Sequence, residues 1–213
     1  MMISKTQGKR ERSKAANREA ILDAARIVFA ELGYESTTVR DIIRRTDLAS
    51  GTFYNYFKSK EEIFEALAEA SVVEFGKLLR MVPRENMSFE EYLKCAFSAY
   101  FHFLVDNHAD VLKLASPQIQ MPDLRTDTPE MNAIFQEIRR DIEMVLESEG
   151  SPDIDTAYLT AAAIGIARET GDVMMARIVS QPNLAQSHID QSTEFASNLV
   201  LCGVRHAFDK IRD

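Results

Sequence analysis

Apolar residues along this chain recur at three- and four-residue spacing, which is typical of helices that bury one face. The first such stretch ends at Leu32, and Gly33 follows at the position where a helix commonly stops in a left-handed residue. Its apolar positions are Ile21, Ala24, Ala25, Val28, Phe29 and Leu32. Residues 1–16 are polar and basic and lack this spacing, so we expect a flexible basic arm ahead of the first helix.

Two short helices are expected next. Thr38 begins the first of them, because Asp41 three residues later resembles the second half of a capping box. The pattern breaks at residues 46–47, after about two turns. The second short helix, from Ser50 to Tyr56, displays hydroxyls, an amide and phenols, which are groups that meet phosphates and base edges. Two short helices joined by a tight turn form a helix-turn-helix, whose second helix enters the major groove of DNA.

The remaining sequence predicts a body of longer helices. Eight Gly and six Pro in 213 residues are few, which favours helices over a loop-rich β architecture. Helices are expected over about residues 59–81, 88–103, 109–115, 130–147, 152–179 and 186–210. Three prolines interrupt residues 116–129, where we expect an irregular connection that could act as a lid or gate. The expected fold class is all-α, with a three-helix helix-turn-helix head and a helical body.

Charge is divided unevenly along the chain. Residues 1–60 contain 12 Lys+Arg and 7 Asp+Glu, a net charge of +5, whereas residues 61–213 contain 13 and 26, a net charge of −13. A basic head can approach a polyanion while an acidic body keeps the protein from coating nucleic acid indiscriminately. Uneven charge also arises by chance on a solvated surface, so the asymmetry supports DNA binding without establishing it.

Residues 18–67 contain a continuous set of motifs that together carry a family resemblance. After Arg18 they read Ile21-Leu22-Asp23-Ala24-Ala25, Phe29, Gly33-Tyr34, Thr37-Thr38-Val39-Arg40-Asp41-Ile42 and Gly51-Thr52-Phe53-Tyr54-Asn55-Tyr56-Phe57-Lys58-Ser59-Lys60-Glu61. This stretch resembles the DNA-binding domain of the tetracycline-repressor (TetR) family of bacterial regulators. The family usually has a small residue in place of Ile43, often Gly in place of Asp47 and commonly a capping Ser in place of Ala49. These departures bear on the docking angle and on operator preference.

The resemblance implies a set of DNA contacts. The residues that it assigns to the DNA face are Thr38, Arg40, Ser50, Gly51, Thr52, Tyr54, Tyr56 and Lys60. Tyr54 and Tyr56 would hydrogen-bond phosphates, and Lys60 would meet a phosphate from the start of the fourth helix. Thr38 and Arg40 would meet the DNA at the start of the second helix. Ser50, Gly51 and Thr52 would face base edges or backbone from the recognition helix. Phe53 and Phe57 are instead expected in the core.

The resemblance also implies a homodimer, in which residues of about 153–180 and 186–210 form a four-helix interface. Packing inside one chain is the alternative for these helices. The family usually binds a small-molecule effector in the body, and its identity is open. Candidate pocket residues are Phe97, Tyr100, Phe101, Met121, Met144, Arg168 and Met174. Aromatic and Met side chains suit an adaptable apolar cavity, but at helical spacing they equally suit a core.

Catalysis, cofactors and membrane insertion find no support in the sequence. The four His and two Cys show no metal-ligand spacing, and no Gly-rich phosphate loop or nucleophile elbow is present. No stretch approaches the ~20 apolar residues of a membrane span. We therefore expect no enzyme and no cofactor, but a cytoplasmic, ligand-responsive regulator with an arm at 1–16, a DNA-binding head at 17–62 and a body at 63–213.

The expected partner is a pseudo-palindromic DNA operator, and the expected activity is repression. An activator or a ligand-independent DNA-binding protein is the first alternative. A protein-interaction module or enzyme that keeps the helical head without binding DNA is the second.

Overall fold

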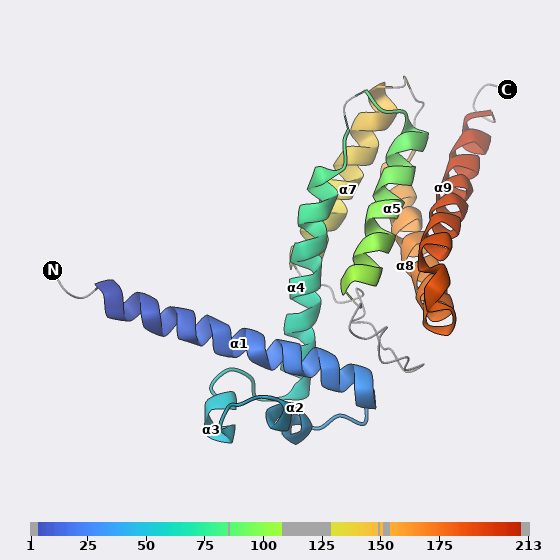
Figure 1. Cartoon of the computed structure of the whole chain (residues 1–213). Helices are drawn as coiled ribbons and strands as arrows, with labels where there is room; N and C mark the ends of the chain where they lie inside the picture. Colours follow the sequence, from blue (N-terminus) through green and yellow to red (C-terminus); the bar gives the residue numbers. More distant parts are fainter. Residues whose placement is uncertain (1–3, 85, 108–128, 149, 151–153, 210–213) are drawn as a thin grey trace. The chain divides into compact units, whose positions relative to one another are not determined.

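The computed structural model describes residues 4–84, 86–107, 129–148, 150 and 154–209, and side chains within these ranges from residue 10 to 205. Over these residues the fold is all-α, as predicted (Figure 1). The helices are α1 (Ser4–Leu32), α2 (Val39–Arg45), α3 (Ser50–Phe53), α4 (Lys60–Met81), α5 (Phe89–Asn107), α7 (Pro129–Ser148), α8 (Thr156–Ser180) and α9 (Ala185–Asp209), with a 3-10 turn at Pro182–Leu184. The helix expected at 109–115, the irregular connection that follows it and Met121 lie outside the described residues.

The chain divides into two compact units after Ala70, and each is considered by itself. The first unit, called the head below, contains α1, α2, α3 and the part of α4 that ends at Ala70. The second unit, called the body, contains the rest of α4 together with α5, α7, α8 and α9. The helix α4 therefore belongs to both units, whereas the sequence placed their boundary after residue 62.

One apolar core holds the four helices of the head together. Its most deeply buried members are Ile21, Leu22, Ala25, Ile42, Phe53 and Ile63, and Phe57 is almost as deeply buried. Gly33 ends α1 with a φ of 78°, the left-handed conformation that its position suggested. The predicted core positions Phe53 and Phe57 are confirmed.

The start of α1 differs from the prediction. The helix begins at Ser4, so residues 4–16 are helical where a flexible arm was expected. These residues include Lys, Arg, Gln, Glu and Ala, which lose little side-chain freedom in a helix. A helix that is already nucleated by the buried part of α1 can therefore continue outward without burying an apolar face.

The start of α8 also differs from the prediction. Asp155, rather than residues 151–152, caps the helix, and its carboxylate accepts hydrogen bonds from the backbone N–H groups of Ala157 and Tyr158 at 2.9 and 3.1 Å. An aspartate in this position satisfies two backbone donors that the first turn would otherwise leave unpaired. The helix accordingly begins at Thr156.

Aromatic packing fills the body between α4, α5 and α8. Phe75 of α4 meets the ring of Tyr100 with centroids 5.3 Å apart, and Tyr100 meets Phe101 at 5.7 Å. Gly171 allows α8 to approach these rings, because a Cβ added there would lie 2.6 Å from Cδ1 of Leu104. The aromatic stripe of α5 is thus used for close helix packing.

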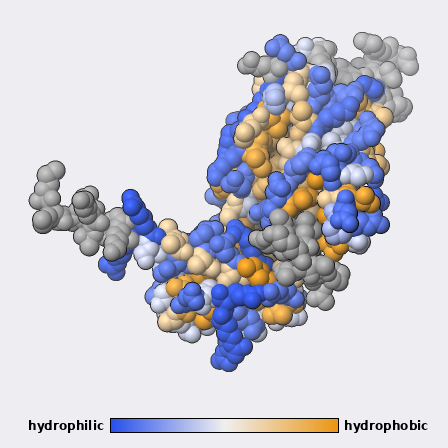
Figure 2. Space-filling model, in the orientation of Figure 1, coloured by the Kyte–Doolittle hydropathy of each residue, from blue (hydrophilic) through white to orange (hydrophobic). Residues whose placement is uncertain are grey.

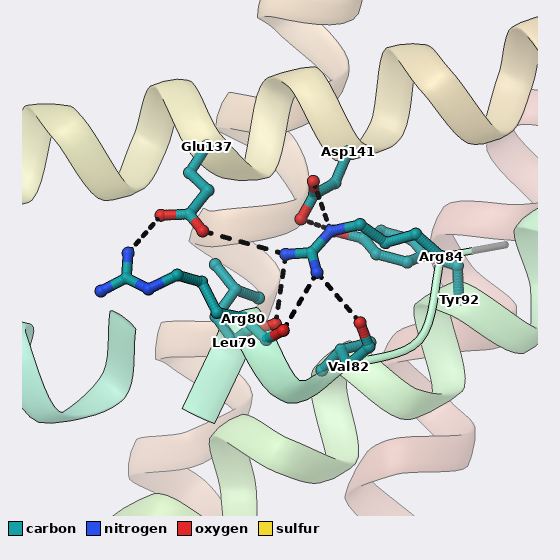
Figure 3. A network of polar contacts seen from close by, with 7 residues as sticks. All are labelled: Leu79, Arg80, Val82, Arg84, Tyr92, Glu137 and Asp141. Carbon is teal, nitrogen blue, oxygen red and sulfur yellow. Dashed lines mark hydrogen bonds and ion pairs between the residues drawn. The ribbon is translucent and has the colours of Figure 1, made fainter. Parts of the chain in front are cut away.

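A polar network fixes the end of α4 to α7 (Figure 3). The Arg84 guanidinium donates to three carbonyl oxygens of the last turn of α4, at 3.1 to 3.3 Å, which belong to Leu79, Arg80 and Val82. Its Nε donates to Asp141 of α7 at 2.6 Å, and the Tyr92 hydroxyl donates to the same carboxylate at 3.5 Å. Burial raises the pKa of Tyr92, which keeps this hydroxyl protonated. The guanidinium thereby caps α4 while it pairs with α7.

We predict that Asp141→Ala lowers the free energy of unfolding by about 2 kcal/mol, because the substitution leaves a mostly buried guanidinium without its anion. The Arg84 side chain is 20% exposed and that of Asp141 is 6% exposed. The control is Glu137→Ala, which removes a more exposed partner of Arg80 and Arg84 and should cost less than about 1 kcal/mol. Urea unfolding followed by circular dichroism makes the comparison, and equal losses would contradict the capping role.

Candidate nucleic-acid interface

The first turn of α2 is closed by the capping box that the sequence predicted. The Asp41 N–H donates to the Thr38 hydroxyl oxygen at 3.3 Å, and the Thr38 N–H donates to the Asp41 carboxylate at 3.0 Å. Hydrogen bonds from the Thr38 hydroxyl and backbone lower the pKa of Asp41, so this cap keeps its charge at neutral pH. Thr38 and Arg40 stand exposed on either side of the start of the helix.

The third helix is very short and depends on its apolar anchors. The helix α3 covers only Ser50–Phe53, and its N-cap Ala49 makes no side-chain capping bond. Phe53 is fully buried, and Phe57 in the following segment is almost fully buried. These two rings hold the segment so that Ser50, Gly51 and Tyr54 are exposed. Thr52 is half-buried.

Tyr56 is tied to the first helix. Asn17 Nδ2 of α1 donates to its hydroxyl oxygen at 3.1 Å, and its ring packs against the head core. Arg18, the neighbour of Asn17, lies over the Phe57 ring with its guanidinium carbon 5.3 Å from the centroid. The N-terminal half of α1 thus braces the segment after α3. The sequence resemblance included Arg18 but gave no role to Asn17.

Lys60 has internal partners that the sequence did not suggest. Its ammonium donates to the carbonyl oxygens of Tyr34 and Glu35, at 2.9 and 3.2 Å. The same nitrogen lies 4.4 Å from the centroid of the Tyr34 ring, which is a cation–π geometry. Lys60 therefore fastens the turn between α1 and α2 to the start of α4. An ammonium has three donors, so a third hydrogen remains for another acceptor.

Basic side chains beyond the predicted set also reach the surface of the head. Arg44, on the last turn of α2, has a side chain 71% exposed and lies 3.9 Å from Asp41. Arg45 pairs with Glu31 of α1 and joins these two helices. The apolar spacing of the sequence predicted only which side of α2 is buried. It did not predict a role for either arginine.

The six described pocket candidates lie on α5, α7 and α8, and the rings of Phe97, Tyr100 and Phe101 pack together on α5. Four of them are buried in the packed body, namely Phe97, Tyr100, Phe101 and Met174. Met144 is exposed on α7, and Arg168 pairs with its neighbour Glu169 at 2.9 Å. The burial of these four residues fits core packing, and their role in effector binding stays a prediction.

A groove of about 830 Å³ lies elsewhere on the body. We call it the body groove and define it by Met81 at the end of α4, His102 on α5 and Glu194 on α9. None of the six described candidate pocket residues lines it. Its volume falls within the range of small-ligand sites in proteins.

In the described parts of the chain, no group of three or more His, Cys, Asp or Glu side chains is placed to hold a metal ion. No described helix is long and apolar enough to cross a membrane.

We predict that Lys60→Met lowers the stability of the head by about 1–2 kcal/mol without any DNA present, because two charged hydrogen bonds and a cation–π contact are lost. Amide hydrogen exchange of the backbone around Tyr34 measures this effect, and exchange should become faster. Lys58→Met, at an exposed position two residues earlier, is the matched control and should leave the exchange unchanged. Unchanged exchange in both variants would mean that Lys60 does not hold this turn.

The similarity to known proteins is strongest in the head. Residues 21–67 match the family described as bacterial regulatory proteins, tetR family. The fatty acid metabolism regulator protein of Bacillus subtilis is 34% identical over 88 residues, which are 41% of this chain and 45% of that protein. This chain thus aligns with less than half of the Bacillus relative. The HTH-type transcriptional repressor KstR2 of Mycolicibacterium smegmatis is 29% identical over 148 residues, which are 66% of this chain and 71% of that protein.

The fold is shared with solved regulators over most of the chain. The structure of FadR from Bacillus subtilis in complex with stearoyl-CoA covers 87% of this chain and 98% of its own, with a TM-score of 0.61 and 22% identity. The matched residues 21–67 contain both short helices and the capping box of α2. The head of this chain is thus similar to the bacterial regulatory proteins of the tetR family over residues 21–67, and the whole fold is similar to that of solved regulators.

Proposed function

We propose that this regulator is a homodimeric repressor that binds a pseudo-palindromic operator and leaves it when a small molecule binds the body. The observation that carries the proposal is the exposed polar face of the head. Thr38 and Arg40 of the α2 start, Ser50 and Gly51 of α3, and Tyr54 all stand exposed on a rigid apolar core. Side chains of these types position a helix on phosphates and read base edges.

The proposed contacts divide into two groups. Ser50, Gly51 and Thr52 face base edges or backbone from α3, whereas Thr38, Arg40 and Tyr54 meet phosphates. Tyr56 and Lys60 also face phosphates, and their internal hydrogen bonds orient them for this task. Fixed side chains lose less freedom on binding than mobile ones, which favours affinity.

The proposed dimer interface is the exposed apolar side of α8 and α9. Phe195 and Leu199 are 60% and 50% exposed on α9, and Val173 is exposed on α8. Figure 2 shows one face of the molecule, where hydrophobic and hydrophilic residues both reach the surface. Added Cβ atoms at Gly165 of α8 and Gly203 of α9 would meet nothing within 4 Å, so a second pair of helices has room to approach. Burial of such a patch against its own copy would follow two-fold symmetry.

Repression and effector binding are supported by the relatives. One relative is named a repressor, and the solved FadR holds stearoyl-CoA. An effector can release DNA only if it binds the DNA-incompetent form of the dimer more tightly than the competent form. The place of action is the cytoplasm, where operator DNA is accessible. An activator is the alternative, since the same head would serve either sign of regulation.

Selection of random duplex DNA on the purified protein, at near-physiological salt, tests the proposal. We expect enrichment of a palindrome whose half-site centres are about one helical turn apart, roughly 34–36 Å, because the two heads of a dimer read two half-sites. The control is Leu199→Arg, which places a charge in the proposed interface and should yield monomers by analytical ultracentrifugation. Enrichment of a single asymmetric site by the unaltered protein would overturn the dimer model.

We predict that Gly51→Ala weakens operator binding at least about tenfold, because a methyl group enters the space between α3 and the DNA. The substitution should not harm the fold, since the added Cβ would meet no protein atom within 4 Å. Fluorescence anisotropy on the selected operator gives the affinity, and thermal unfolding gives the stability. Unchanged affinity would show that Gly51 does not approach the DNA.

A further inference from the structure

The body groove has two chemically different ends. The last turn of α4 supplies apolar side chains, among them Leu78, Met81 and Val82. Met81 is 77% exposed, the second highest value among the exposed large apolar side chains of the described residues. The polar end comes from α5 and the first half of α9. A mixed lining of this kind suits an amphipathic molecule that is fixed by a few polar groups.

The polar end of the groove is negatively charged. One lysine and three carboxylates line the groove, so the formal net charge of the lining is −2. The lysine, Lys94, pairs with Glu90 at 2.7 Å, which neutralises it from outside the groove. Arg205 pairs with the same glutamate at 3.1 Å. The three carboxylates, those of Asp106, Asp190 and Glu194, therefore set the sign of the local potential.

The uncharged polar groups of the lining include His102 and Thr193. His102 Nδ1 lies 2.8 Å from the Ser98 carbonyl oxygen, which can only accept, so Nδ1 carries a hydrogen and donates it. The Thr193 hydroxyl oxygen is buried and has no hydrogen-bond partner among the described residues. A ligand with positive charge and N–H or polarised C–H groups would complement this lining better than an anion.

The apolar end is held in place by the network of Figure 3. Arg84 donates to the carbonyls of Leu79 and Val82, and its Nε is bound to Asp141 of α7. Val82 itself lines the groove. One wall of the groove is therefore fixed before any ligand arrives, which lowers the entropic cost of binding.

We infer that the body groove binds a small organic cation with an apolar body. The apolar part would contact Met81 and Phe103, and the charge would lie near Asp106 and Glu194. An anionic ligand such as the stearoyl-CoA found in the FadR structure would meet like charges here. This inference names a ligand class for the proposed function. The regulatory effect of the ligand rests on that function, whereas binding of the ligand in the groove requires no DNA.

Isothermal titration of the full-length protein with two ions of equal size tests this inference. Tetraphenylphosphonium and tetraphenylborate have the same shape and opposite charge, so a difference between them reports electrostatics alone. We expect the phosphonium ion to bind at one site per chain and the borate ion not to bind. Glu194→Gln should weaken phosphonium binding roughly threefold, the scale of one partly exposed ion pair.

Met81 and Met144 are both exposed methionines. Substitution of Met81 tests the position of the site, and the same substitution of Met144 is the matched control. Met81→Lys places a positive charge inside the groove and should weaken phosphonium binding by more than about tenfold. Met144→Lys adds the same charge on α7, outside the groove, and should leave the affinity within about twofold. Equal binding of both ions, no binding of the phosphonium, or loss of binding only in Met144→Lys would each overturn the inference. All of these titrations lack DNA, so their failure is separate from failure of the DNA selection.

Discussion

The surface proposed to face DNA depends on apolar burial beneath two helices that are too short to be stable alone. The helix α3 has four residues and no side-chain cap, and α2 has seven. An isolated helix of this length does not persist in water, because nucleation costs more than a few hydrogen bonds return. Ile42 and Phe53, both fully buried, supply the missing stability through α1 and α4. The polar residues between Ile42 and Phe53 are therefore held in an orientation that these short helices could not maintain alone.

Polar contacts then define both ends of α4, the helix that the two units share. At its start, the Ser59 hydroxyl accepts from the Glu62 N–H, and the Glu62 carboxylate accepts from the Lys58 N–H. At its end, Arg84 covers the final carbonyls and pairs with Asp141. Side chains thus satisfy backbone groups at both ends, with Ser59 and Glu62 at the start and Arg84 at the end.

Local chemistry explains which features the sequence could predict. The capping boxes of Thr38 with Asp41 and of Ser88 with Glu91 span three residues, so they can be recognised without the fold. The roles of Lys60 and Tyr56 involve partners 26 and 39 residues away, and no periodic pattern encodes such contacts. The partners Arg84 and Asp141 are 57 residues apart and form the same kind of long-range pair.

The pocket residues remain a prediction, and the chemistry of aromatic residues explains why the sequence alone could not decide between a cavity and a core. Phe97, Tyr100 and Phe101 on α5 have the composition of a ligand cavity, yet the same composition packs well against a helix that approaches at Gly171. Only the space left after packing distinguishes a cavity from a core. Polar residues of α5 line the body groove, among them Ser98 and His102. No pattern in the sequence indicated that these residues share a site.

Helix α9 contributes residues both to the body groove and to the proposed dimer interface. Successive residues of a helix are about 100° apart, so Glu194 in the groove and Phe195 on the exposed apolar side face different directions from neighbouring positions. Its third side, with Ala196 and Val200, is buried in the body. A ligand in the groove would therefore touch α4, which continues into the head, and α9, which carries the proposed dimer contact. A molecule that favours one arrangement of these two helices would shift the dimer toward that arrangement, by no more than its difference in affinity for the two.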